Sequence, residues 1–82
     1  GPIEISQVDQ FNHELDMVRG DVPIKTAYSL VDRNCSDLKG GVTKEDSWTN
    51  ISRENPTIAE DDLAGILGIG QKHNCPEVGE NA

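Results

Sequence analysis

The chain has few of the residues from which a large hydrophobic core is built. Only 34% of its 82 residues are apolar, and the aromatic side chains are limited to Phe11, Tyr28 and Trp48. A chain of this length forms one domain at most and buries a modest core. The composition therefore predicts a single small domain with a core of leucine, isoleucine and valine.

Basic residues are also scarce. Seven lysines and arginines stand against 15 aspartates and glutamates, which gives a formal net charge of −8. Nucleic acids are bound by basic faces, so neither a nucleic acid nor an anionic membrane surface is expected as a partner. No apolar run approaches the roughly 20 residues of a membrane span. The charge leaves three interpretations open, namely a cationic protein partner, bound calcium, or simple solubility.

Cysteine and histidine are too few and too scattered to indicate an enzyme or a zinc protein. Cys35 and Cys75 permit one disulfide without requiring it. A structural zinc site needs four ligands at workable spacing, and a catalytic thiol needs a base and an orienting group that converge on it. Neither pattern is present, so we expect no enzymatic activity.

The cellular location is left open by the sequence, although an intracellular location is favoured. Two N-x-[ST] patterns begin at Asn34 and Asn50, and both could carry glycans in a secreted eukaryotic protein. The opening Gly1-Pro2 resembles the remnant of a cleaved tag, so the natural start and the extent of the full protein are also open.

Apolar residues spaced three and four apart predict two helices in the first half of the chain. The first covers residues 7–19, with Ser6 as its cap, after a short extended lead-in over residues 1–5. The second begins near residue 22 and ends at Val31. Alternation over residues 22–30 also allows a strand, but the helix explains more of the apolar positions.

Two further helices are predicted in the second half. The third is capped by Thr43 and ends before Asn55-Pro56, since proline disfavours helix in the residue before it. The fourth is capped by Thr57 and ends at the glycines between residues 68 and 70. We thus expect an all-α domain of four helices over residues 6–67, followed by a flexible polar tail over residues 68–82.

An oxygen-rich stretch, residues 32–46, separates the second and third predicted helices. Asp32, Asn34 and Ser36 place oxygen atoms at alternate positions, and Gly40-Gly41 supply a sharp turn. Oxygen atoms at alternate positions are typical of a calcium-binding loop. A plain polar connector between helices explains the same residues.

With its flanks, this stretch resembles an EF-hand of the calmodulin type. The sequence AYSLVDRN, residues 27–34, is similar to the end of the entering helix and the start of the loop, and VTKED, residues 42–46, is similar to the loop's end. Residues 55–63 resemble the linker and the next entering helix. The resemblance covers residues 5–67 and implies paired helix–loop–helix units with a short β-bridge at Val42.

The resemblance implies a calcium site, but the loop departs from the family pattern. The expected ligands are Asp32, Asn34, Ser36 and Asp46. Such a loop has about 12 residues, glycine at the sixth position and a bidentate glutamate at the end. Here the sixth residue is Asp37, the loop is about three residues too long, and Asp46 is shorter than glutamate. We therefore expect calcium binding to be weak or lost, and no other cofactor.

An EF-hand without calcium can still bind a partner's amphipathic helix between its own helices. The apolar candidates for such a groove are Phe11, Leu15, Met17, Tyr28, Trp48 and Ile51. The same residues would serve as core in so small a domain. The sequence predicts an acidic protein-interaction module that binds a helical or basic segment of another protein.

Two other functions are compatible with the sequence. One is an acidic inhibitor or adaptor with an unrelated helical fold. The other is a helix-turn-helix DNA-binding domain, because residues 57–69 resemble the first helix and turn of that unit. A recognition helix would have to follow, and Pro76 leaves little room for it.

Overall fold

The computed structural model describes residues 2–79, with side chains from residue 9 onward. Over these residues all regular secondary structure is helical, as the sequence predicts, but there are five helices. Their bounds are α1 Pro2–Val18, α2 Ile24–Lys39, α3 Lys44–Glu54, α4 Glu60–Asn74 and α5 Pro76–Gly79.

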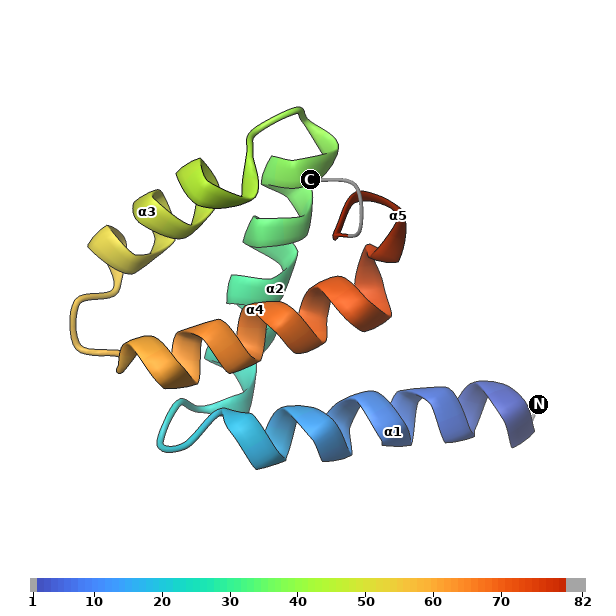
Figure 1. The fold of residues 1–82 in the computed structure, drawn as a ribbon. Coiled ribbons are helices and arrows are strands. Elements are labelled where there is room, and N and C mark those ends of the chain that lie inside the picture. Colours follow the sequence, from blue (N-terminus) through green and yellow to red (C-terminus); the bar gives the residue numbers. More distant parts are fainter. Residues whose placement is uncertain (1, 80–82) are drawn as a thin grey trace.

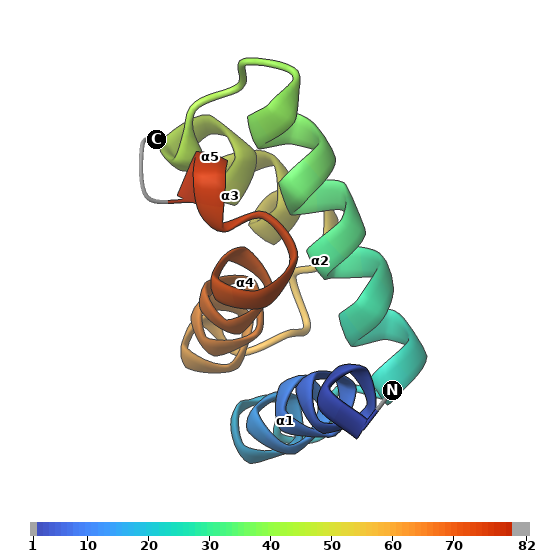
Figure 2. The ribbon, with the colours of Figure 1, turned by 90° about the vertical axis from the view of Figure 1, so that its right-hand side faces the viewer.

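Helix α4 is the element against which most of the bundle packs. It contacts α1, α2 and α5, whereas α3 packs mainly on α2. Figure 1 shows α1 alongside α4, with α2 crossing α4 at a steep angle. The turned view in Figure 2 shows α1 below α4 and α2 on its right-hand side. The core therefore lies around α4.

The core is made almost wholly of aliphatic side chains, as the scarcity of aromatic residues requires. Its most deeply buried aliphatic members come from four helices: Leu15, Ala27, Val31, Ile51, Leu63 and Ile66. The three aromatic residues lie at its edge, where Phe11 and Trp48 are half-buried and Tyr28 is 37% exposed.

Two glycines in α4 allow the neighbouring helices to approach its backbone. A Cβ added at Gly65 would lie 2.7 Å from the Cβ of Val18 in α1, and one added at Gly70 would lie 2.6 Å from a methyl group of Val31 in α2. Atoms at these distances overlap, so any larger residue would push the helices apart.

The helix boundaries differ from the prediction in the first two helices, whereas α3 has the predicted bounds. Residues 2–6, expected outside the first helix, belong to α1, and residues 32–39, expected as a loop, are the last two turns of α2. Thr43 caps α3 as predicted, because its side chain accepts a hydrogen bond from the backbone N–H of Asp46. Since the oxygen-bearing residues 32–37 are helical, the predicted loop is wrong there.

The predicted polar tail is also wrong over most of its length. α4 continues through the glycines to Asn74, and a short helix, α5, follows. The start of α4 also differs from the prediction, because Ala59 occupies the cap position expected for Thr57. Of the tail, only residues 80–82 lie outside the described part of the chain.

A disulfide fixes this end of the chain. Cys35 of α2 is bonded to Cys75, which lies between α4 and α5, across a sequence separation of 40. Both cysteines are buried. The bond therefore joins the end of α4 to the last two turns of α2 and adds a covalent connection to a small core.

Substitution of Gly70 tests the close approach of α2 and α4. We expect Gly70→Ala to lower the free energy of unfolding by about 1–3 kcal/mol, because its methyl group overlaps Val31. Gly68→Ala is the matched control, since nothing lies within 4 Å of a Cβ at Gly68. That change should raise stability by about 0.5–1 kcal/mol, the usual gain from alanine inside a helix. Urea unfolding measures both; a shift of the same sign in the two variants would contradict the packing argument.

Loss of the disulfide should destabilise the domain strongly. Opening a covalent loop of this length restores chain entropy to the unfolded state, which corresponds to about 4 kcal/mol. We expect the free energy of unfolding to fall by that amount, and the denaturant midpoint to fall with it, when the protein is reduced and in the double variant Cys35→Ala, Cys75→Ala. Equal midpoints for the oxidised and reduced protein would show that the bond contributes nothing.

Candidate functional site

The structure does not bring the predicted calcium ligands together. Asp32, Asn34 and Ser36 lie within α2, where residues two apart point to nearly opposite sides of the helix. Asp32 and Ser36 are exposed, whereas Asn34 is only 2% exposed on the inner face. These oxygens cannot surround one ion, so this part of the prediction is wrong.

The end of the predicted loop, residues 42–46, forms the connection from α2 to α3 and the first turn of α3. Asp46 lies in the first turn of α3, and the backbone N–H of Val42 donates to the carbonyl of Asp37 at 2.9 Å instead of forming a β-bridge. Within the described residues, no three or more histidine, cysteine, aspartate or glutamate side chains are grouped so that they could hold a metal ion.

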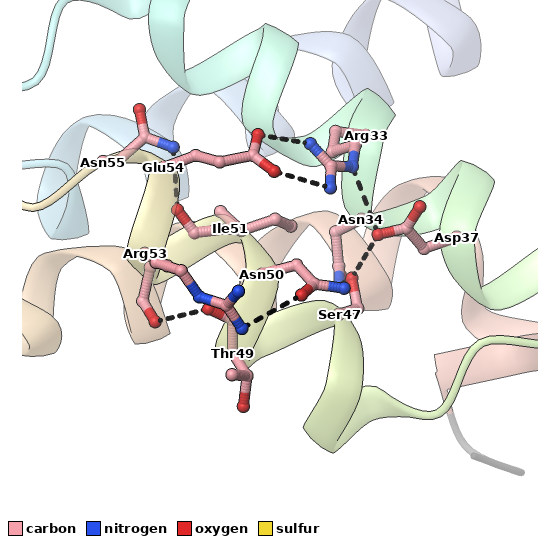
Figure 3. A network of polar contacts seen from close by, with 11 residues as sticks. Arg33, Asn34, Asp37, Ser47, Thr49, Asn50, Ile51, Arg53, Glu54 and Asn55 are labelled. Carbon is pink, nitrogen blue, oxygen red and sulfur yellow. Dashed lines mark hydrogen bonds and ion pairs between the residues drawn. The ribbon is translucent and has the colours of Figure 1, made fainter.

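Asn34 is the centre of a buried polar network that joins three helices. Figure 3 shows the part of the network between α2 and α3. Its amide nitrogen donates to the hydroxyl of Ser47 in α3 at 2.9 Å, and its oxygen accepts from Gln71 in α4 at 2.9 Å. Ser47 in turn donates to a carboxylate oxygen of Asp37 at 2.8 Å. A buried amide must be satisfied in this way, so the network fixes α3 and α4 on α2.

The network reaches the surface through Arg33. This side chain contacts Asp37 at 3.3 Å and binds both carboxylate oxygens of Glu54 in α3, at 2.8 and 3.2 Å. The arginine lowers the pKa of Glu54, and Glu54 raises the pKa of Arg33. Among the described side chains, no buried polar atom lacks a partner. The network is thus complete in itself, with a structural role.

The six residues expected to bind a partner are dispersed. Leu15 and Ile51 are no more than 1% exposed and belong to the core, so they are not accessible to a partner. Met17 is 73% exposed on α1, and Trp48 is half-buried on α3. The structure therefore does not gather them into one groove.

Phe11 and Tyr28, the remaining two, form an aromatic corner with His73. The ring of Phe11 lies 6.1 Å from that of Tyr28 in α2 and 5.4 Å from that of His73 in α4. Beside this corner, Glu14 contacts the amine of Lys72 and the ring of His73, each at 2.8 Å. These contacts attach α1 to the other two helices.

The contacts of Glu14 predict a pH dependence. Hydrogen bonds from Lys72 and then His73 lower the pKa of Glu14 in the folded state from its usual 4.5. A carboxylate with a lowered folded pKa stabilises the fold above its unfolded pKa, and that contribution is lost as the pH falls through the folded pKa. We expect Glu14→Gln to reduce the loss of thermal stability between neutral and acidic pH, whereas Glu45→Gln, at an exposed site on α3, should leave the wild-type profile. Identical profiles for Glu14→Gln and the wild type would contradict the attachment.

A groove lies where the α1–α2 and α3–α4 connections meet, and we refer to it as the loop groove. It has a volume of about 380 Å³. Its lining residues come from both connections and the adjoining helix turns: Asp21, Val22, Pro23, Thr26, Asn55, Thr57, Ile58, Ala59 and Asp62.

Gly20 allows the two sides of the loop groove to lie close together. Its φ of 55° is in the left-handed region, where a side chain is strained. A Cβ at this position would also lie 2.6 Å from a carboxylate oxygen of Asp62. Glycine therefore allows the α1–α2 turn to contact the first turn of α4 directly.

The charge of the loop groove is entirely negative. Its lining includes two carboxylates, Asp21 and Asp62, and no basic side chain. Of the basic residues near the lining in sequence, Arg19 bonds to Asp16 and to the carbonyl of Val22, each at 2.7 Å. Lys25, which precedes Thr26, is exposed and is not part of the lining. Apolar floor residues, Val22 and Ile58, lie beside the carboxylates. The loop groove can thus hold a cationic side chain with an aliphatic stem.

Comparison of the chain with protein-family models, with characterised proteins and with solved structures finds no match. Within the part of the chain that the structure describes, no helix combines the length and apolar character needed to cross a bilayer. Sequence reasoning missed the loop groove because its residues are far apart in the chain. The available signals were the acidic residues that start α4 and the Gly20-Asp21 pair that follows α1.

Proposed function

We propose that this domain is an acidic protein-interaction module that binds a basic segment of a partner protein in the loop groove. The observation that supports the proposal is the pairing of two carboxylates with an apolar floor in one groove. The proposed role needs neither calcium nor an enzymatic step. It also does not depend on the resemblance to EF-hands.

The groove chemistry favours lysine or arginine in the partner. The aliphatic stem of such a side chain can lie on Val22 and Ile58, while its charged end reaches Asp21 or Asp62. Asp62 is half-buried, so water screens its interaction with a bound cation less than that of a fully exposed carboxylate.

The overall charge would assist the encounter with a basic partner. A net charge of −8 on a small domain attracts cationic segments over several ångströms and raises their association rate. An acidic inhibitor would use the same chemistry on a basic enzyme, so it differs in the partner and not in the binding site.

DNA binding receives less support. In a helix-turn-helix unit the second helix lies in the major groove and reads the bases. Here the helix after α4 is α5, which has four residues and begins at Pro76. Cys75, at the corner between them, is tied to α2. We therefore do not propose DNA binding.

Charge reversal at Asp62 tests the proposal. The probe is an amphipathic peptide rich in lysine and arginine, titrated into isotope-labelled protein and followed by amide NMR shifts. We expect the largest shifts at residues 20–26 and 55–62. Asp62→Lys should weaken binding by at least about fivefold, because it removes one partly exposed ion pair worth about 1 kcal/mol and places a like charge beside the bound cation. Binding should also weaken with added salt.

Two controls separate the loop groove from general charge attraction. Asp32→Lys makes the same charge change on an exposed face of α2 and should retain most of the affinity. A second peptide, with each basic residue replaced by glutamate, should not bind. Equal weakening by Asp32→Lys and Asp62→Lys, or shifts spread evenly over the surface, would contradict binding in the loop groove.

A further inference from the structure

The two N-x-[ST] patterns of the chain differ sharply in their surroundings. Asn34, in the first, is 2% exposed, and both polar atoms of its amide are hydrogen-bonded, to Ser47 and Gln71. A sugar on this buried nitrogen, which lies against Ser47, would have to push α2 and α3 apart. The folded protein therefore has no room for a glycan at this position.

Asn50, in the second pattern, lies on α3 and is half-buried. Its side-chain oxygen accepts a long hydrogen bond, 3.5 Å, from Arg53, and its amide nitrogen is not bonded to any described residue (Figure 3). Ser52, which completes the pattern, is also only partly buried. The acceptor nitrogen at Asn50 can thus be substituted without loss of a hydrogen bond within the fold.

The position of α3 favours the same residue. This helix packs mainly on α2 and lies at the outside of the bundle, as Figures 1 and 2 show. The core-facing residues of α3 are Ser47 and Ile51. A glycan attached at Asn50, on the flank of that face, can extend into solvent while α3 stays in place.

The disulfide indicates a compartment in which glycosylation occurs. Structural disulfides form and persist mainly in oxidising environments such as the secretory pathway. In eukaryotic cells the same pathway transfers oligosaccharides to Asn-x-Ser/Thr patterns. Cys35–Cys75 is buried and links two helices, as a structural disulfide does.

We propose that Asn50 carries an N-linked glycan and that Asn34 remains unmodified in the folded protein. The donor is an oligosaccharide linked to a lipid diphosphate. The Asn50 amide nitrogen forms a bond to the anomeric carbon of the first sugar, the bond from that carbon to the phosphate oxygen breaks, the lipid diphosphate leaves, and the amide nitrogen loses one proton. The proposal is independent of the loop groove.

The test uses the full chain, directed into the secretory pathway of cultured animal cells by a cleavable leader. Two matched serine variants remove the patterns without changing either asparagine. Ser52→Ala removes the pattern at Asn50, and Ser36→Ala removes the one at Asn34 at an exposed serine. Both the medium and the cell lysate are digested with a glycosidase specific for N-linked glycans and analysed by gel mobility and peptide mass spectrometry.

The wild type and Ser36→Ala should each show one glycan, at Asn50, that the glycosidase removes, and Ser52→Ala should show none. Absence of a glycan from wild-type protein in both medium and lysate would overturn the proposal. So would a glycan at Asn34 in secreted, disulfide-bonded protein. Because occupancy is measured in both fractions, poor secretion of a variant does not prevent a decision.

Discussion

The contact of α1 and α2 with the bare backbone of α4 determines how the whole domain is arranged. With few apolar residues and only three aromatic rings, the chain cannot fill wide spaces between helices. Gly65 and Gly70 remove that need, because Val18 and Val31 lie directly on the α4 backbone at these positions. Short distances between helices let small aliphatic side chains fill the core completely.

The sequence predicted the helical class well, because the class depends on local periodicity. Three- and four-residue spacing identified the central parts of α1 to α4, and the Thr43 cap of α3 was predicted correctly. The predicted ends of α2 and α4 are wrong because the contacts that decide where these helices end come from other helices. Glycines in α4 have the same local preference as helix-ending glycines, and only the neighbouring helices reveal that they serve packing. The polar residues at the end of α2 likewise gave no local sign that they would be held in a helix.

The candidate site shows the same limit more strongly. The sequence indicates Asn34 as a metal ligand because its sequence neighbours carry oxygen, whereas its partners are Ser47 and Gln71, which lie 13 and 37 residues away. The loop groove is formed by two connections from different parts of the chain, and no local sequence pattern predicts that they lie side by side. Oxygen-bearing residues that are close in sequence therefore suggest calcium binding at residues 32–46, where the folded chain does not bring them together. What could be predicted of the site was its negative charge and the kind of partner that charge permits.

The disulfide divides the chain into a covalent ring and an arm. Residues 35–75 form a closed ring that contains α3, all of α4 and the connection between them, whereas α1 and residues 24–34 of α2 lie outside it. The loop groove has one wall from each part: residues 21–26 belong to the arm and residues 55–62 to the ring. Its width is therefore set by noncovalent docking of the arm, through the contacts of Phe11, Glu14 and Gly20. A partner that wedges the loop groove open would work against those contacts and leave the ring intact.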